Sequence, residues 1–210
     1  MKTVIYNQMS VMALLLFLFT VNKAFSQGQA PEVKSLEYEI QLGATLPFGS
    51  YHEGKANVGP LLGPVELRYN VEDSPFDISL SLGLSTAIWD IPVQKPVIDY
   101  DKEEFTGEYT SEMQEQNNRS AYLAIGGNYN FKQGRQCNPF VGLGLGLVYK
   151  DVLTGPLDGE GTSPVIIPRF GVELFRHLRF TCASHISRNG WNNISLAVGV
   201  VFGGGLKKNK

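Results

Sequence analysis

The chain has 210 residues, with 18 lysines and arginines against 20 aspartates and glutamates and a formal net charge of −2. This near-neutral balance provides no basic surface for nucleic acid, so we expect no nucleic-acid partner. Only 18% of the residues are charged while 23 are glycine, which suits strands whose apolar residues alternate with small or polar ones. The length is sufficient for one domain with a sizeable core.

The first 26 residues have the parts of a secretory signal peptide. Lys2 supplies the positive start, residues 11–21 form an apolar run, and Ala24-Phe25-Ser26 places small residues where a signal peptidase reads. The run is shorter than the roughly twenty residues that a membrane-spanning helix needs. We therefore predict a signal peptide over residues 1–26, a linker over 27–35, a folded domain over 36–203 and a basic tail over 204–210.

A period of two organises the folded domain from its first residues. Leu36, Tyr38 and Ile40 alternate with Glu37 and Glu39, and successive side chains of a strand point to opposite faces. This stretch therefore predicts a strand with one apolar and one polar face. The same alternation recurs and predicts eight strands, over residues 35–48, 61–71, 76–89, 120–131, 139–149, 165–175, 179–187 and 193–202.

Two of these strands contain local features that bear on their faces and pairing. In the second strand, Leu61 and Val65 are expected to share the apolar face. In the sixth, Pro168 lacks the N–H that a ladder position needs, which predicts a bulge or interrupted pairing there. The two cysteines, Cys137 and Cys182, are too few for a disulfide framework, and we expect unpaired thiols.

The connections alternate between short turns and longer segments, as in an up-and-down barrel. The longest, residues 90–119, reads as a loop with an acidic middle. Carboxylates suit Ca²⁺ and Mg²⁺, but the spacing is not that of an EF-hand, and charge runs are usually solvated. We therefore expect no metal and no cofactor. The fold class predicted is all-β, an eight-stranded antiparallel up-and-down barrel over residues 36–203.

The polarity of the strands favours a transmembrane barrel over a soluble lipocalin-like one. Alternate residues of a strand share one face, and we call each such set a parity, apolar or polar. The polar parity is rich in Gly, Ser, Ala and Asn, whereas a soluble barrel would carry Lys and Glu on its outer face. Strands of about ten residues, tilted by about 40°, span about 25 Å, the height of the apolar band. Aromatic residues on the apolar parity gather at strand ends, as in membrane-interface girdles: Tyr38, Tyr69, Phe76, Tyr129, Phe131, Phe180 and Phe202 at the short turns, Phe48 and Tyr149 at the other end.

The sequences PRFGVEL at residues 168–174 and AVGVVFGGG at residues 197–205 add a family likeness. With the strand pattern, they make the chain resemble the small eight-stranded outer-membrane barrels, the OmpA/OmpX-like class, and more narrowly a Bacteroidota-type outer-membrane β-barrel domain. The resemblance implies residence in the outer membrane, among its lipids and lipopolysaccharide. It also implies periplasmic short turns, with extracellular loops near residues 49–60, 89–119, 150–163 and 187–192.

The polar parity predicts a charged network in the lumen. Charges in a narrow lumen must pair or stay hydrated, and side chains nearly fill an eight-stranded barrel. We therefore expect a salt-bridge plug, with a narrow ion channel as the alternative. Its predicted members are Glu37, Glu39, Glu66, Arg68, Asp77, Arg169, Glu173 and Arg179. The alternating Gly142, Gly144 and Gly146 are expected to leave room for long side chains from across the lumen.

One segment, His185-Ile186-Ser187, resembles the His-x-Ser of outer-membrane lipid A deacylases, which implies Ser187 as nucleophile and His185 as base. Arg188 follows the pair and no acid occurs in residues 193–210, so we assign no catalytic residue. The expected function is that of a non-enzymatic outer-membrane barrel, serving envelope integrity or contacting an unknown surface partner through its extracellular loops. A lipid A-modifying enzyme, a narrow channel and a soluble lipocalin-like binder are the alternatives.

Overall fold

The computed structural model describes residues 33–48, 54–99, 104–156, 159–188 and 192–203. These contain nine antiparallel strands and no helix long and apolar enough to cross a membrane. The predicted signal peptide, most of the linker and the basic tail lie outside the described residues. The strands are β1 (Leu36–Phe48), β2 (Lys55–Asn57), β3 (Gly59–Asn70), β4 (Phe76–Asp99), β5 (Glu104–Asn130), β6 (Cys137–Thr154), β7 (Gly161–Leu174), β8 (Leu178–Ser187) and β9 (Asn192–Phe202).

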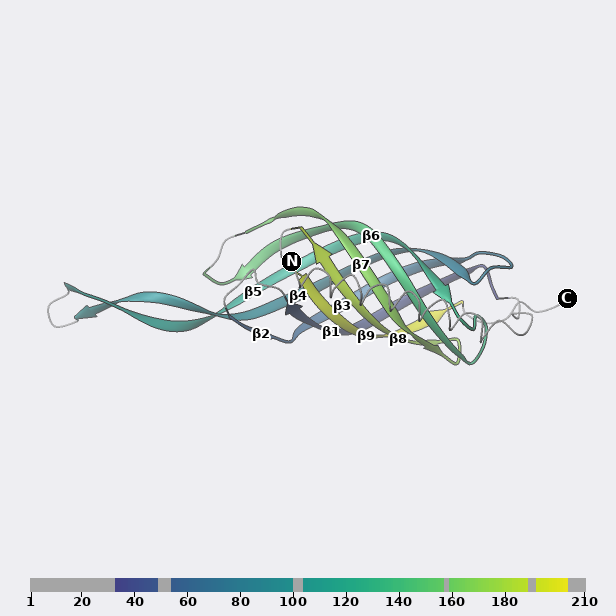
Figure 1. The fold of residues 1–210 in the computed structure, drawn as a ribbon, viewed down its shortest axis with the longest axis horizontal. Helices are drawn as coiled ribbons and strands as arrows, with labels where there is room; N and C mark the ends of the chain where they lie inside the picture. The colour runs from purple at the N-terminus through teal and green to yellow at the C-terminus, as the bar shows by residue number, and fades with distance from the viewer. Residues whose placement is uncertain (1–32, 49–53, 100–103, 157–158, 189–191, 204–210) are drawn as a thin grey trace, which may run out of the picture.

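Eight of the strands close into a ring (Figure 1). Their order is β4-β3-β1-β9-β8-β7-β6-β5, and β5 pairs back with β4. The first and last strands pair from Tyr38–Phe202 to Phe48–Asn192, so the ring has no free edge along the barrel wall. The short β2 pairs with β4 above the end of the β3–β4 ladder. The predicted eight-stranded antiparallel up-and-down barrel is confirmed.

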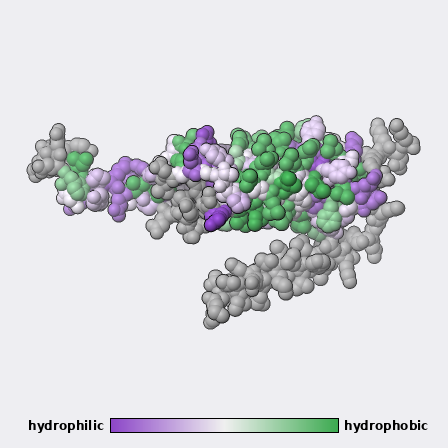
Figure 2. All heavy atoms as spheres, turned by 90° about the horizontal axis from the view of Figure 1, so that it is seen from above, coloured by the Kyte–Doolittle hydropathy of each residue, from purple (hydrophilic) through white to green (hydrophobic). Residues whose placement is uncertain are grey.

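The barrel has polar groups inside and apolar groups outside. Leucines on the outer parity are half exposed, as at Leu80 (46%) and Leu82 (55%), while Glu39 and Arg68 on the inner parity are 0% and 1% exposed. Figure 2 shows the apolar residues gathered around the middle of the barrel, with hydrophilic residues toward its ends. This polarity is opposite to that of a soluble barrel and is that of a transmembrane one, because lipid is the solvent that favours such an outer surface.

An aromatic rim lies at the end of the barrel where β3–β4, β5–β6 and β7–β8 are joined by short turns, which we call the short-turn end. Tyr38 stacks on Phe202 with ring centroids 4.9 Å apart. Tyr129 contacts Phe76 at 5.2 Å and Phe131 at 5.1 Å, both edge to face. These rings belong to the set that the sequence predicts at this end.

The largest departure from prediction is residues 90–119, expected as a loop. There β4 and β5 continue as a two-stranded hairpin that projects far beyond the barrel (Figure 1). Their register runs without a shift from Phe76–Tyr129 to Pro96–Tyr109. The loop prediction was wrong because a ribbon outside lipid has no apolar belt to face, so its sequence loses the alternation that marks the barrel strands.

Two smaller predictions also needed correction, one about a strand face and one about the length of a loop. Leu61 is 2% exposed and faces the lumen, whereas Leu62 is 57% exposed. The cause is a register shift between Leu62 and Val65, where Gly63 adopts a φ of 91° and reverses the alternation. Similarly, β6 and β7 extend to Thr154 and from Gly161, so the connection there is shorter than the predicted residues 150–163.

Pro168 is accommodated without a bulge, contrary to the first of the two predicted outcomes. It pairs in register with Leu143 on β6. On the other side, the β7–β8 ladder lacks pairs between Ile166 and Arg169 and resumes in the same register. The missing N–H therefore interrupts the ladder locally and leaves the strand order unchanged. Cys137 and Cys182 are both unpaired.

Candidate functional site

Arg68 is the centre of a buried charged network in the short-turn half of the lumen. Its guanidinium lies 3.2 Å from Glu37, 3.6 Å from Glu39, 3.9 Å from Glu66 and 3.3 Å from Glu173. The strand alternation places these groups inside, since each sits on the inner parity of β1, β3 or β7. A guanidinium with several donors can serve several carboxylates at once, so Arg68 ties three strands together across the lumen.

Two further arginines extend this network. Arg169 forms an ion pair with Glu66 and donates from Nη2 to Ser79 Oγ at 2.7 Å. Arg179 lies 3.7 Å from Glu39 and 3.8 Å from Glu173. Its guanidinium also stacks over the ring of Phe140, 3.5 Å from the centroid, a cation–π contact. Paired charges from β1, β3, β7 and β8 therefore occupy this half of the lumen.

Asp77, the remaining predicted member, lies beside the network in a cradle of amides. Its two carboxylate oxygens accept hydrogen bonds from Asn128 Nδ2 at 2.6 Å and Asn130 Nδ2 at 2.8 Å. Sequence reasoning missed these amides, and it also missed Phe140 and Gln41, which donates to Glu39 at 2.6 Å. All four lie on the inner parity of their strands, which is the signal that could have identified them.

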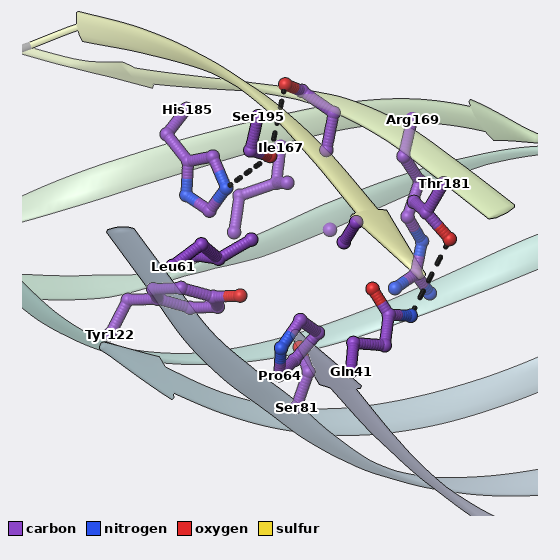
Figure 3. Close-up of a pocket in the computed structure, with 13 residues that line it drawn as sticks. Gln41, Leu61, Pro64, Ser81, Tyr122, Ile167, Arg169, Thr181, His185 and Ser195 are labelled. Atoms are coloured by element: carbon purple, nitrogen blue, oxygen red, sulfur yellow. Dashed lines mark hydrogen bonds between the residues drawn. The ribbon is translucent and has the colours of Figure 1, made fainter. Parts of the chain in front are cut away.

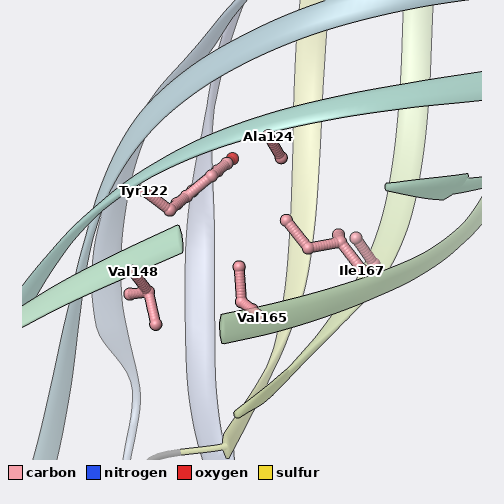
Figure 4. Close-up of a cluster of buried hydrophobic side chains, with 6 residues drawn as sticks. Tyr122, Ala124, Val148, Val165 and Ile167 are labelled. Carbon is pink, nitrogen blue, oxygen red and sulfur yellow. The ribbon is translucent and has the colours of Figure 1, made fainter. Parts of the chain in front are cut away.

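The half of the lumen nearer the hairpin contains a cluster of buried apolar side chains beside buried polar ones such as Lys150 and Ser187. Figure 4 shows this cluster, formed by Tyr122, Ala124, Val148, Val165, Ile167 and Ala183. Between it and the charged network lies a cavity of about 20 Å³, whose lining includes Gln41, Tyr122 and Arg169 (Figure 3). Such a volume holds little more than one water molecule. Buried side chains therefore occupy the lumen at two levels, charged toward the short turns and partly apolar toward the hairpin.

The glycines of β6 have a more local role than predicted. A Cβ on Gly142 would collide with Asn128, and one on Gly146 would collide with the β5 backbone at Leu123 and Ala124. A Cβ on Gly144 would lie 3.4 Å from Ile167. The space that these glycines leave is taken by the neighbouring strands β5 and β7, so the prediction of room for side chains from across the lumen was wrong for Gly142 and Gly146.

His185 and Ser187 both lie inside the barrel near its hairpin end, but each has another partner. The His185 Nε2 atom lies 3.5 Å from Ser195 Oγ, and its ring packs edge to face against Tyr122 at 4.7 Å (Figure 3). Ser187 Oγ accepts a hydrogen bond from Lys150 Nζ at 2.5 Å. The geometry thus brings Ser187 to a lysine and His185 to a different serine, and no hydrogen bond between His185 and Ser187 occurs in the described structure.

The projecting hairpin differs on its two faces. Its base is anchored by the buried side chains of Ala87, Trp89 and Ile91, against which Ala56 packs. Farther out, Tyr109 and Met113 are 62% and 59% exposed on the outer face. On the other face, Lys95 forms an ion pair with Glu112 across the two strands. Within the described ranges, no group of three or more His, Cys, Asp or Glu side chains is placed to hold a metal ion.

No model of a known protein family matches the chain, and no curated protein sequence matches it. Among solved structures, Neisserial surface protein A (NspA) is 12% identical, with 80% of this chain and 97% of that chain covered and a TM-score of 0.45. The N-terminal β-barrel domain of Pseudomonas aeruginosa OprF is 14% identical, over 81% and 100%, with a TM-score of 0.37. Ail, the attachment invasion locus protein of Yersinia pestis, is 11% identical, over 82% and 99%, with a TM-score of 0.33. The fold assignment rests on the strand ring and not on these scores.

Proposed function

We propose that this chain is an integral outer-membrane protein, exported with a cleaved signal peptide over residues 1–26, whose function is surface contact through the β4–β5 hairpin. Lipids and lipopolysaccharide surround its apolar belt. The short turns and both termini face the periplasm, and the hairpin and the longer loops face outward. The protein needs no cofactor and catalyses no reaction in this proposal, and its loop partner is a component of the surroundings outside the cell.

The observation that carries this proposal is the projection of a long ordered hairpin above a filled lumen. The ion pairs and the apolar cluster inside the lumen argue against passage of solutes and against entry of a substrate. The hairpin, in contrast, exposes aromatic and apolar side chains such as Tyr109 and Met113. Exposed apolar groups outside lipid are typical of contact surfaces, so the hairpin is the part of the molecule best suited to meet a partner.

A hairpin-less barrel tests the proposal. Residues 91–114 are replaced with an Asn-Gly turn, which joins the paired residues Asp90 and Glu115. Cells expressing either form are compared for attachment to a surface coated with serum proteins and for resistance to detergent. We expect the variant to reach the outer membrane, shift on unheated gels, keep detergent resistance and lose attachment. Unchanged attachment with lost detergent resistance would replace surface contact with an envelope-integrity role.

The channel alternative is tested separately. The purified wild-type barrel is inserted into planar lipid bilayers, and single-molecule currents are recorded. We expect no discrete conductance steps, because charged and apolar side chains fill the lumen at two levels. Regular steps from folded protein would contradict the closed lumen and favour the narrow channel.

A further inference from the structure

The β7–β8 turn, residues 175–177, and the β5–β6 turn, residues 131–136, lie side by side at the short-turn end of the barrel. We propose that they form a binding site for the headgroup of an anionic phospholipid in the periplasmic leaflet. In this site the Phe175 ring enters the lipid surface, and the Arg135 and Arg176 side chains bind the lipid phosphate. This inference rests on the proposed placement in the outer membrane and is independent of the contact function of the hairpin.

Phe175 and Arg176 have a backbone conformation that bulky side chains rarely adopt. Their φ values are 54° and 65°, in the left-handed region that tight turns usually fill with asparagine or glycine. The N–H of His177 donates to the Leu174 carbonyl at 3.1 Å and closes the turn. Strained residues of this kind gather at sites of function, so a phenylalanine at this position points to a contact that its ring makes.

Two hydrogen bonds fix this turn to the β5–β6 turn. The Phe175 N–H donates to the Gln136 carbonyl at 2.6 Å, and Arg176 Nε donates to the Gly134 carbonyl at 2.9 Å. The Phe175 side chain is 67% exposed, more than the rim aromatic Tyr38 at 51%. The two turns therefore form one braced unit, from which an aromatic side chain projects.

The depth of this unit matches that of the lipid headgroups. Val172 and Phe180 are paired across β7 and β8, and Phe180 belongs to the aromatic residues of this end, which mark the membrane interface. Phe175 follows Val172 by three residues, which places it about 8 Å farther out at about 3.3 Å per residue and a tilt of about 40°. The polar headgroup layer extends about 5 to 8 Å beyond the hydrocarbon core. Phe175 and Arg176 therefore lie at the level of the headgroups, where lipid is the partner at hand.

Charge selects an anionic lipid. The basic residues of the two turns are Lys132, Arg135 and Arg176. Neither turn contains an acidic residue, whereas the β3–β4 turn contains Glu72 and Asp73. Arg135 is exposed and Arg176 is half-buried, and a guanidinium binds a phosphate through two parallel hydrogen bonds. Basic side chains strengthen binding to an anionic membrane surface, and an aromatic ring beside them anchors at the same level, so the unit suits a negatively charged headgroup.

The test uses the full-length protein in nanodiscs of phosphatidylcholine mixed with phosphatidylglycerol. Native mass spectrometry counts the phosphatidylglycerol molecules that remain bound when the barrel is released from the disc. Arg135→Gln removes one charge of the site, and Lys34→Gln removes the charge of another exposed residue at the same end of the barrel. Phe175→Asn removes the ring and suits the left-handed backbone. Folding of each variant is checked by the gel shift on heating.

We expect Arg135→Gln to lower the amount of bound phosphatidylglycerol about fivefold and Lys34→Gln to lower it less than about twofold. Phe175→Asn should bind about threefold less of this lipid. In vesicles of phosphatidylcholine alone, the same variant should unfold at a higher urea concentration than the wild type, because the backbone strain is relieved. A residue with a merely structural role would not give these two opposite effects.

Equal losses of lipid in Arg135→Gln and Lys34→Gln, or unchanged binding by Phe175→Asn, would overturn the site. Displacement of phosphatidylglycerol by inorganic phosphate would indicate a site for free anions and refute its assignment to lipid. The hairpin-less barrel should bind as much phosphatidylglycerol as the wild type, so the lipid site and the hairpin contact stand or fail separately.

Discussion

Replacing Arg68 with methionine should destabilise the barrel more than any other single charge removal. The side chain is 2% exposed and lies within 3.9 Å of four carboxylates. Methionine keeps the approximate length and removes the charge. Counting Asp77, the predicted network then contains five carboxylates against the two remaining guanidinium groups of Arg169 and Arg179.

Removing one partner of a buried ion pair costs about 3 to 5 kcal/mol, because the other charge is left uncompensated. Since Arg68 serves four carboxylates, we expect the upper end of that range, about 5 kcal/mol. Folded proteins have a total stability of about 5 to 15 kcal/mol, so Arg68→Met should be only marginally folded. The free energy of unfolding is measured by urea titration of the barrel in lipid vesicles.

The matched control is Arg119→Met. Arg119 also binds a carboxylate, with Nη2 2.6 Å from Asp151, but its side chain is 58% exposed. An exposed ion pair contributes at most about 1 kcal/mol, so this variant should unfold almost like the wild type. If Arg68→Met and Arg119→Met lose the same free energy, burial of the network does not determine its energetics, and the reasoning is refuted.

Three further predictions concern the belt, the lumen and the alternative chemistry. Leu80→Arg on the lipid-facing side should cost about 2 to 4 kcal/mol, against about 0 to 1 kcal/mol for Leu153→Arg near the end of β6, in the same urea titration. Gly83→Val should lose about 1 to 3 kcal/mol, because a Cβ there would lie 2.6 Å from the Tyr122 ring, and Tyr122→Ala should recover part of this loss. Lipid A from cells expressing wild type or Ser187→Ala should give the same mass spectrum; an acyl chain lost only with the wild type would contradict the non-enzymatic assignment.

The barrel could be predicted from sequence because lipid imposes one simple rule on every residue of its strands. In β1, Leu36, Tyr38 and Ile40 face outward and Glu37 and Glu39 face inward, as the alternation indicates. A departure from strict alternation is not visible in composition. Gly63 reverses the faces in β3 through its backbone angle, and apolar residues on both sides of that position fit either register.

The sequence predicts which charged residues lie in the lumen better than it predicts which of them pair with each other. Parity places Arg68, Arg169 and Arg179 inside, but it does not say which carboxylates each one meets across the ring, because that depends on the stagger between strands far apart in sequence. The same limitation applied to Ser187: proximity in sequence suggested His185, whereas the barrel brings Lys150 from two strands away. The hairpin was missed because a two-stranded ribbon outside lipid needs no apolar face. Its sequence therefore lacks the alternation of apolar and polar residues that marks the barrel strands.

The register between β4 and β5, which is unshifted as far as Pro96, also has a mechanical consequence. The ten residues from Asp90 to Asp99 reach about 33 Å beyond Trp89 at about 3.3 Å per residue, and the same two strands continue into the barrel wall. The buried side chains of Ala87, Trp89 and Ile91 brace the junction, so no hinge separates the two parts. A sideways pull at the tip therefore acts as a lever with that arm, and its torque reaches the lipid through the aromatic rim and belt as a tilt of the whole molecule.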